Sequence, residues 1–413
     1  MKTRLLYIEC GTTFNTELIT GIQRVVRNLS KEIAHVAPLM GYQPIFISSR
    51  KGNFCDDSID ITPLKFPKWI KEFLNPLKRY SIYIKFRSLI APLVHLIRNR
   101  VMDPRKLTLE PVGPDGFSSV LLLIDSTWDV EIFPKINEFR VAGGKVCAVL
   151  YDLIPFSHPS TVETSTRLLF EKWWCEAPNH INYLMCISQT VRQEFITWQK
   201  QTARQSLISE EKIGFFHLGA NLADATDPVI RLLSENEPYF LVVGSIEPRK
   251  NHITILDAFE LLWEGGSPAR LAFAWKNEWK TESLIHRLAN HPQKGRKLFL
   301  IKDTTDRDLV ALYKCSSGLI NASIVEGFGL PLIEAGALGV PVICSDIPVF
   351  REVGGDYPTY FSPLESKHLA RCISENLNKR VWRSVGRMNN VMSWRESVEH
   401  LLRGLDLMMK PNE

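Results

Sequence analysis

The chain has 413 residues, of which 45% are hydrophobic, 10% aromatic and 23% charged, and its formal net charge is +5. That length exceeds what one hydrophobic core usually supports, so two domains are expected, and the ordinary composition excludes wholesale disorder.

No apolar run approaches the roughly 18–20 residues of a membrane span. The eight cysteines are scattered singly, which indicates a cytoplasmic protein with reduced thiols. The first apolar run breaks at Glu9, which favours a strand over a signal peptide.

The first half of the chain alternates apolar runs with helical patterns. Strands are expected at residues 4–10, 44–49, 120–124, 145–151, 181–187 and 212–217. Such near-continuous hydrophobicity is typical of a parallel sheet that is covered on both faces. A helix is expected over residues 22–36, with Thr20 as its N-cap. Gly21 could admit a diphosphate there, with Arg24 in the first turn, but this signal is weak by itself, and the alternative is an ordinary amphipathic helix that begins with glycine.

A basic insertion is expected at about residues 50–115. Residues 61–106 carry eleven Lys and Arg against two acidic residues, a net charge of +9, with aromatic side chains between them. We favour docking on an anionic membrane surface, where each well-placed basic residue contributes about 1 kcal/mol. A solvated insertion with a small hydrophobic face is an equally good interpretation, because five prolines prevent one long helix. Nucleic acid binding fits less well than either.

Polar residues follow several of the predicted strands, at the sheet edge where ligands bind in α/β proteins. Asp125, the pair Tyr151 and Asp152, and Ser188 occupy such positions. Asp152 could contact a ligand, or it could only cap a loop at the strand end.

A second alternation is expected beyond the polar stretch at 219–238, with strands at 239–244, 271–275, 297–301 and 318–321. Arg249 and Lys250 lie between a strand and a helix predicted over 253–262. Arginine can bind two phosphate oxygens at once and lysine acts as a point charge, so the pair could neutralise a diphosphate. The alternative is that Arg249 and Lys250 are only solvated cations in a loop.

Residues 321–355 contain a glycine-rich turn, a helix start and two glutamates eight positions apart. Residues 322–325 are expected to end a strand, and Pro331 suits the first helical position because its missing N–H is not needed there. Gly327 and Gly329 would let the backbone approach a ligand, and the helix N-terminus offers N–H groups to a diphosphate.

The two glutamates of this stretch have different expected partners. Glu326 would face the group beyond the diphosphate, and Glu334 could accept hydrogen bonds from a ribose diol. The alternative is that the glycines only shape a turn and that Glu334 is only a favourable acid near a helix start.

The chain offers little support for a metal site. Asp306 and Asp308 have the D-x-D spelling, but they suit the N-cap and first turn of a helix over 306–315. The ten histidines form no close pair with ligand spacing, so no metal is predicted.

Several motifs resemble glycosyltransferase family 4, a family of retaining enzymes with the GT-B fold. The stretch E-G-F-G-L-P-x-x-E-A-x-A-x-G-x-P-V-I-x-S resembles its E-x7-E signature, G-x-x-x-P-R-K-N its diphosphate motif, and T-G-I-Q-R-V-V-R-N-L its N-terminal loop. LLLIDSTWD and YDLIP are similar to members related to bacterial O-antigen mannosyltransferases. Many relatives have histidine at Tyr151, so a histidine contact to the sugar is not implied here.

The resemblance implies an α/β protein with two Rossmann-like domains facing across a cleft. An acceptor-side domain would span residues 1–222 and a nucleotide-sugar domain residues 223–392. Ser393 begins a capping box, and a C-terminal helix within 393–413 would return to the first domain.

The implied reaction moves a hexose, with mannose from GDP-mannose favoured, to a lipid-linked saccharide or polysaccharide acceptor in bacterial surface polysaccharide synthesis. No metal or other cofactor is implied, and the protein would be cytoplasmic or peripheral on the inner face of the plasma membrane. The catalytic residues would be Glu326, Arg249 and Lys250. The donor would contact Gly21, Glu334, Gly327, Phe328, Gly329 and Leu330. The acceptor and sugar side would comprise Arg24, Tyr151 and Asp152.

Two other classes of protein remain open. A sugar-nucleotide epimerase of the same fold would use a similar pocket, but it needs no lipid-linked acceptor, and the basic insertion argues mildly against it. A non-catalytic carbohydrate-binding or assembly protein would be expected to have lost the glutamates or the cation pair, and all four residues are present.

Overall fold

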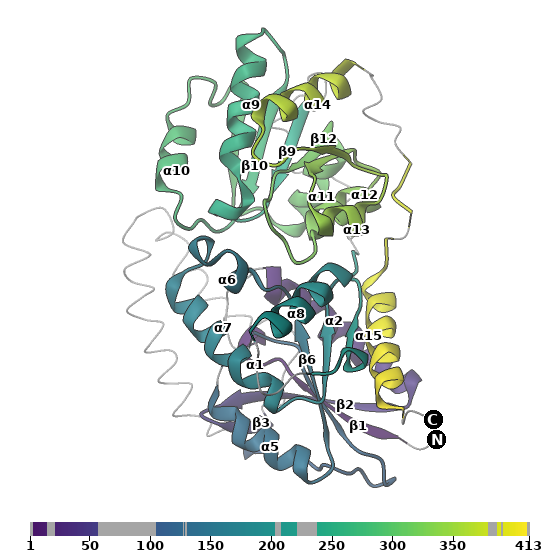
Figure 1. Ribbon diagram of the computed structural model, residues 1–413. Coiled ribbons are helices and arrows are strands. Elements are labelled where there is room, and N and C mark those ends of the chain that lie inside the picture. Colours follow the sequence, from purple (N-terminus) through teal and green to yellow (C-terminus); the bar gives the residue numbers. More distant parts are fainter. Residues whose placement is uncertain are drawn as a thin grey trace, which may run out of the picture. The chain divides into compact units, whose positions relative to one another are not determined.

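The computed structural model describes residues 3–14, 21–56, 105–126, 128, 130–202, 208–220, 238–378, 386–389 and 391–410. Within these ranges the chain forms two β-sheets with helices packed on them (Figure 1). It divides into two compact units, Met1–Val149 with Lys172–Tyr183, and Leu150–Glu171 with Leu184–Glu413. The predicted α/β class with two Rossmann-like sheets is confirmed. The predicted domain boundary at residue 222 lies outside the described residues.

The first sheet has eight strands in the order β4-β3-β2-β1-β5-β6-β7-β8. Their bounds are β1 Arg4–Glu9, β2 Tyr42–Arg50, β3 Asn53–Asp56, β4 Arg105–Lys106, β5 Val120–Leu123, β6 Lys145–Leu150, β7 Tyr183–Cys186 and β8 Ile213–Phe215. β1 is parallel to β2 and β5, and β5 is parallel to β6. β5 and β7 are buried along their whole length, which accounts for their unbroken hydrophobicity.

The helices of this half follow the strands as expected. They are α1 Gly11–Phe14, α2 Gly21–Val36, α5 Phe133–Val141, α6 Ile154–Ser157, α7 Thr164–Glu176 and α8 Gln189–Gln201. The apolar face predicted for α2 is buried, for instance at Val26, Leu29 and Ile33. The predicted N-cap Thr20 lies outside the described residues.

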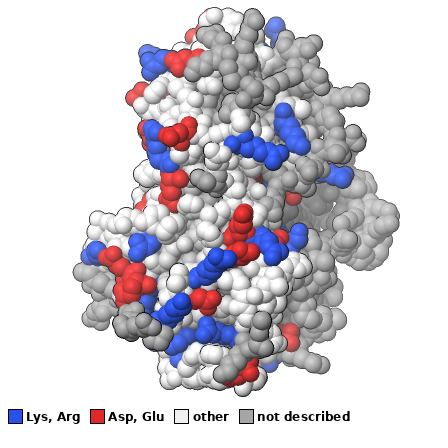
Figure 2. Space-filling view, turned by 90° about the vertical axis from the view of Figure 1, so that its right-hand side faces the viewer, with Lys and Arg blue, Asp and Glu red and all other residues white. Residues whose placement is uncertain are grey.

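The region of the predicted basic insertion begins and ends with short antiparallel strands, since β3 pairs with both β2 and β4. Residues 57–104, which hold most of the segment 61–106, lie outside the described residues, so membrane docking stays a prediction. On the face seen in Figure 2, Lys and Arg are interspersed with Asp and Glu over the described surface. Among the described helices, none combines the length and hydrophobicity needed to span a membrane.

The second sheet has six strands in the order β11-β10-β9-β12-β13-β14, and its pairs are parallel. The strands are β9 Tyr239–Val243, β10 Arg270–Trp275, β11 Leu298–Lys302, β12 Gly318–Asn321, β13 Val342–Ser345 and β14 Thr359–Phe361. Successive strands run outward from β9 to one edge and from β12 to the other. The order therefore reverses between β9 and β12, and crevices for ligands form at the carboxyl ends of strands at such a point.

The helices of the second half are α9 His252–Glu264, α10 Glu282–Ala289, α11 Asp306–Cys315, α12 Leu330–Ala337, α13 Pro348–Gly354 and α14 Ser366–Asn378. α9 and α14 lie side by side, as do α12 and α13 (Figure 1). Phe259, Phe273 and Phe361 are buried in one hydrophobic core between this sheet and its helices. This packing holds the strands in place, and the loops at their carboxyl ends form the site described below.

The C-terminal helix α15, Trp394–Met409, packs against β8, the last strand of the first sheet. The predicted capping box is confirmed, with Ser393 accepting a hydrogen bond from the Glu396 N–H and the Glu396 carboxylate accepting one in return. The Ser397 hydroxyl donates to the His217 carbonyl at 2.7 Å. The prediction that the final helix returns to the first sheet is thus confirmed.

Two local predictions were wrong. The strand before the glycine-rich turn ends at Asn321 instead of extending through 322–325, because the Asn321 side chain accepts a hydrogen bond from the N–H of Ser323 and so forms a turn. The N-cap of α11 is Thr305 rather than Asp306, since Thr305 and Asp308 form a capping box.

Candidate functional site

The reversal point of the second sheet brings two loops together. The loop after β9 contains a short 3-10 turn, Pro248–Lys250, and ends at Asn251, whose φ of 52° is left-handed. The loop after β12 contains the glycine-rich turn, residues 326–329, which we call the glycine turn. The N–H of Ile324 donates to the carbonyl of Arg249 at 2.9 Å, so the two loops are joined by their backbones.

Five side chains from these loops form a charged group, which we call the Glu326 cluster: Glu247, Arg249, Lys250, Ser323 and Glu326. Arg249 donates to Glu326 Oε2 at 3.0 Å, and Lys250 donates to Glu326 Oε1. The Ser323 hydroxyl donates to the same Oε1 at 2.7 Å. Arg249 Nε is 2.9 Å from Glu247 Oε2. Of the three residues predicted to be catalytic, Arg249 and Lys250 therefore both contact Glu326.

The cluster is shielded from solvent, because the side chains of Glu326, Lys250 and Arg249 are only 9%, 16% and 19% exposed. Burial raises the pKa of Glu326, but Lys250 and Arg249, together with the Ser323 hydroxyl, lower it to about 2. Burial lowers the pKa of Arg249, but Glu326 and Glu247 raise it above its usual range. The cluster consequently holds fixed charges of both signs in a poorly solvated place, where electrostatic interactions are strongest.

The glycine turn touches the residues that follow β6. A Cβ on Gly327 would lie 2.1 Å from the Tyr151 carbonyl oxygen and 3.1 Å from Asp152 Cβ. Gly329 has a φ of 107°, and a Cβ there would lie 2.8 Å from the Phe350 ring. Both glycines are thus required by contacts within the chain, and their predicted contact with a donor stays a prediction.

Glu334 is buried in α12, and the Tyr313 hydroxyl donates to its Oε2 at 3.2 Å. Leu330 is the first residue of that helix, with Pro331 beside it as expected. Phe328 is also buried, with its ring 5.6 Å from that of His217. The predicted roles of Glu334, Leu330 and Phe328 in binding a donor stay predictions.

Asp152 Oδ1, in the loop that leads from β6 into α6, accepts a hydrogen bond from the N–H of Ile154 at 3.0 Å, which agrees with the structural role considered above. Burial raises its pKa, partly offset by Arg249 and by that N–H. Burial and the neighbouring Asp152 also raise the pKa of Glu194, on α8, to about 7. Asp152 therefore belongs to the electrostatic surroundings of the Glu326 cluster and also holds the loop before α6.

Gly21 and Arg24 lie in the first turn of α2, in the first unit. A Cβ on Gly21 would meet no heavy atom within 4 Å, and the predicted contacts of both residues with a donor stay predictions. Within the described ranges, no group of three or more His, Cys, Asp and Glu residues is arranged to hold a metal ion.

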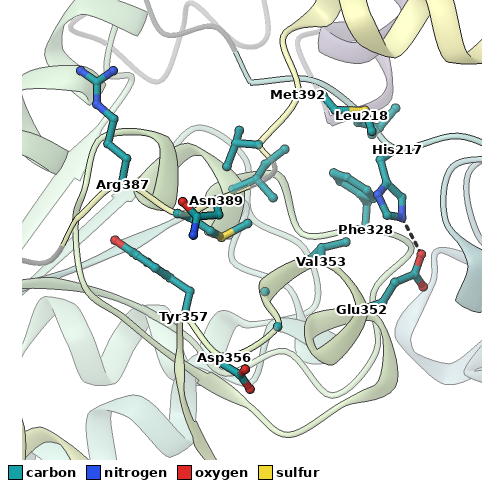
Figure 3. A pocket seen from close by; sticks show the side chains of 15 residues that line it. His217, Leu218, Phe328, Glu352, Val353, Asp356, Tyr357, Arg387, Asn389 and Met392 are labelled. Carbon is teal, nitrogen blue, oxygen red and sulfur yellow. Dashed lines mark hydrogen bonds and ion pairs between the residues drawn. The ribbon is translucent and has the colours of Figure 1, made fainter.

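A cavity of about 580 Å³ borders the glycine turn, with Phe328 and Ile333 in its wall. His217 lies beside Phe328 and turns toward Glu352, which it contacts at 2.7 Å, while Tyr357 and Arg387 lie farther round the rim (Figure 3). None of the three charged residues predicted to be catalytic is among its lining residues.

Sequence reasoning missed Ser323, Glu247 and His252. Ser323 and Glu247 bind the cluster directly, but a single serine or glutamate in a loop gives no signal in the sequence. His252 begins α9 directly after the cation pair and is only 3% exposed. Burial, followed by Lys250 and Arg249, lowers its pKa to about 3, so the imidazole is neutral at physiological pH.

The buried imidazole predicts a specific pH dependence of stability. Because the folded pKa of His252 lies below the unfolded value of about 6.5, the unfolded chain alone takes up this proton as the pH falls from 6.5 toward 3. Between pH 7 and pH 5 the wild type should lose about 2 kcal/mol more unfolding free energy than His252→Gln, measured by urea denaturation. The exposed His286→Gln variant is the matched control. Equal losses in the wild type and His252→Gln would contradict the assignment.

Residues 224–390 match the protein family described as "Glycosyl transferases group 1". The serotype-specific mannosyltransferase WbdA of Escherichia coli is 33% identical over 311 residues, which are 71% of this chain and 38% of WbdA. This chain thus spans well under half the length of that relative. The O-antigen chain mannosyltransferase B of Escherichia coli is 24% identical over 242 residues, covering 58% of this chain and 63% of that protein.

A solved structure of Anabaena HepE in complex with UDP and glucose has a TM-score of 0.59 at 12% identity, over 98% of this chain and 99% of that one. This likeness bears on the fold alone, and together with the two sheets and the returning C-terminal helix it identifies the GT-B fold. The match to the group 1 glycosyl transferases covers residues 224–390, and all five residues of the Glu326 cluster lie within it.

Proposed function

We propose that the chain is a retaining glycosyltransferase that moves mannose from GDP-mannose to a hydroxyl of a glycan or lipid-linked saccharide in bacterial surface polysaccharide synthesis. The observation that carries this proposal is the Glu326 cluster at the reversal point of the second sheet. The names of the related proteins, a serotype-specific and an O-antigen chain mannosyltransferase, support the choice of sugar and pathway.

The chemistry of the cluster suits a nucleotide diphosphate donor. As the bond to the sugar breaks, negative charge grows on the diphosphate and positive charge on the anomeric carbon. Arg249 and Lys250 would stabilise the negative charge on the diphosphate. The Glu326 carboxylate stays ionised because its pKa is about 2. It would support the positive charge on the anomeric carbon and hold sugar hydroxyls. Charges that are already fixed before the reaction cost no reorganisation when it occurs.

The remaining proposed roles are those that the sequence motifs imply. Glu334 would accept hydrogen bonds from the ribose, with Gly21, Arg24, Phe328 and Leu330 near the donor. Tyr151 and Asp152 would face the transferred sugar and the acceptor, on a domain of residues 1–222. The leaving diphosphate itself would help to remove the acceptor proton on the same face, so catalysis would rest on positioning and charge and would need no metal.

The proposal is tested by thermal-shift measurements of the purified chain with GDP, UDP, dTDP, ADP and CMP, each with and without EDTA. A ligand at about 100 times its Kd adds about 2.7 kcal/mol of stability. We expect a stabilising shift selective for GDP, unchanged by EDTA and lost in Arg249→Ala. Arg351→Ala is the control, because Arg351 pairs with Asp346 at 2.7 Å outside the cluster. No shift with any nucleotide would contradict a donor site.

A further inference from the structure

The Ser188 hydroxyl makes two hydrogen bonds that connect a helix to the glycine turn. Ser188 follows β7 and is the N-cap of α8, accepting a hydrogen bond from the Val191 N–H at 3.1 Å. The same hydroxyl donates to the carbonyl oxygen of Gly327 at 2.9 Å. Its side chain is completely buried. A hydroxyl has one hydrogen to donate, so the contact with Gly327 uses the whole donor capacity of this side chain.

The end of α8 that carries Ser188 is itself anchored. Glu352, on α13, accepts hydrogen bonds from the N–H groups of Gln189 at 2.6 Å and Thr190 at 2.7 Å, and from the Thr190 hydroxyl at 2.5 Å. His217 contacts the same carboxylate at 2.7 Å. The carboxylate thus occupies N–H groups at the start of α8 that have no partner within the helix, and it keeps this end of α8 beside α13.

The glycine turn is therefore held from two sides. Ser188 fixes the Gly327 carbonyl, and the Tyr151 carbonyl lies so close to the Gly327 α-carbon that no side chain fits between them. Because a peptide unit is planar, fixing the Gly327 carbonyl also fixes the direction of the Phe328 N–H. Glu326 directly precedes Gly327 in the chain. A rotation of the Glu326 backbone would therefore move the Gly327 α-carbon and carbonyl and strain the hydrogen bond from Ser188.

We propose that Ser188 is a positioning residue for the transfer reaction, which holds the Gly327 carbonyl and so keeps Glu326 aligned with Arg249 and Lys250. This inference rests on the proposed function. A misplacement of about 1 Å by a residue outside the chemistry can cost about 10²-fold in rate. Loss of the hydrogen bond to Gly327 should therefore lower kcat by roughly 10- to 100-fold.

Four variants separate this role from simple helix capping. Ser188→Asp keeps an N-cap acceptor for Val191 but has no proton to donate to Gly327. Ser188→Thr keeps both the acceptor and the donor, and Ser188→Ala loses both. Ser393→Ala loses an N-cap hydroxyl on α15, where it accepts from the Glu396 N–H at 3.2 Å, and is the matched control.

Two readouts are needed, kcat and KM for mannosyl transfer from GDP-mannose, and hydrogen exchange of the peptide covering residues 324–332. We expect Ser188→Asp and Ser188→Ala to lose 10- to 100-fold in kcat with faster exchange in this peptide. KM for the donor should change less, and Ser188→Thr and Ser393→Ala should match the wild type.

Unchanged exchange in Ser188→Asp would overturn the inference whatever the activity, because Ser188 would not hold the turn. Faster exchange with wild-type kcat would overturn it too, while leaving the proposed function intact. A wild-type chain that transfers no mannose, with the exchange difference still present, would refute the proposed function and with it the role in transfer.

Discussion

Replacing Glu326 with glutamine should lower the kcat of mannosyl transfer by about 10²–10³-fold while the chain stays folded. Glutamine has nearly the same shape and keeps an oxygen for Arg249 or Lys250, but it removes the negative charge that the cluster holds beside two cations. The loss should appear in kcat more than in KM, because this charge matters most when positive charge develops on the sugar. Release of GDP from GDP-mannose in the presence of acceptor measures both constants.

The matched control is Glu260→Gln. Glu260 lies on α9, where its carboxylate also has two basic partners, Arg287 and, at 3.0 Å, His291. Its replacement removes a similarly paired charge outside the Glu326 cluster, so kcat should stay within about twofold of the wild type. Turnover by Glu326→Gln at the level of the control would show that Glu326 has no part in the reaction.

Replacing Gly327 with alanine should be nearly as damaging, for a steric reason. The new methyl carbon would lie 2.1 Å from the Tyr151 carbonyl oxygen, a separation that no relaxed structure allows, and the neighbouring group is backbone. The turn must therefore move, which takes Glu326 out of line with its partners. We expect kcat to fall by about 10²-fold and the free energy of unfolding to fall by about 1–3 kcal/mol.

Gly386→Ala is the control for this substitution, because a Cβ at Gly386 would meet no heavy atom within 4 Å. Its kcat and unfolding free energy, from urea denaturation followed by circular dichroism, should match the wild type. If Gly327→Ala were as stable and as active as Gly386→Ala, the close packing of the turn against Tyr151 would not exist in solution.

Buried apolar runs made the central strands and helices predictable. α11 has the predicted bounds, and β12 and β9 begin where expected. The antiparallel strands β3 and β4 gave no such signal, because Asn53–Asp56 and Arg105–Lys106 are short and partly polar and lie at a sheet edge. The Thr305 N-cap could have been predicted from the T-x-x-D spacing of its capping box.

Arg249, Lys250 and Glu326 could be predicted because each follows a strand of a parallel sheet, and neighbouring strands end at one edge. Arg249 and Glu326 lie 77 residues apart in sequence, yet their side chains meet at 3.0 Å. Sequence could not show that Gly327 packs against the Tyr151 carbonyl or that Ser188 donates to the turn. Those contacts depend on how separate elements pack, which leaves no local pattern in the chain.

The product of the reaction decides whether the chain is a retaining mannosyltransferase. The purified chain is incubated with GDP-mannose and a mannose-terminated oligosaccharide, and the anomeric proton of any new residue is observed by NMR. Because the mannose of GDP-mannose is α-linked, a retaining transferase should form an α-linked mannoside in step with the release of GDP, and Glu326→Gln should form almost none. A β-linked product, or GDP-mannose that stays intact in the presence of this acceptor, would contradict the proposed function.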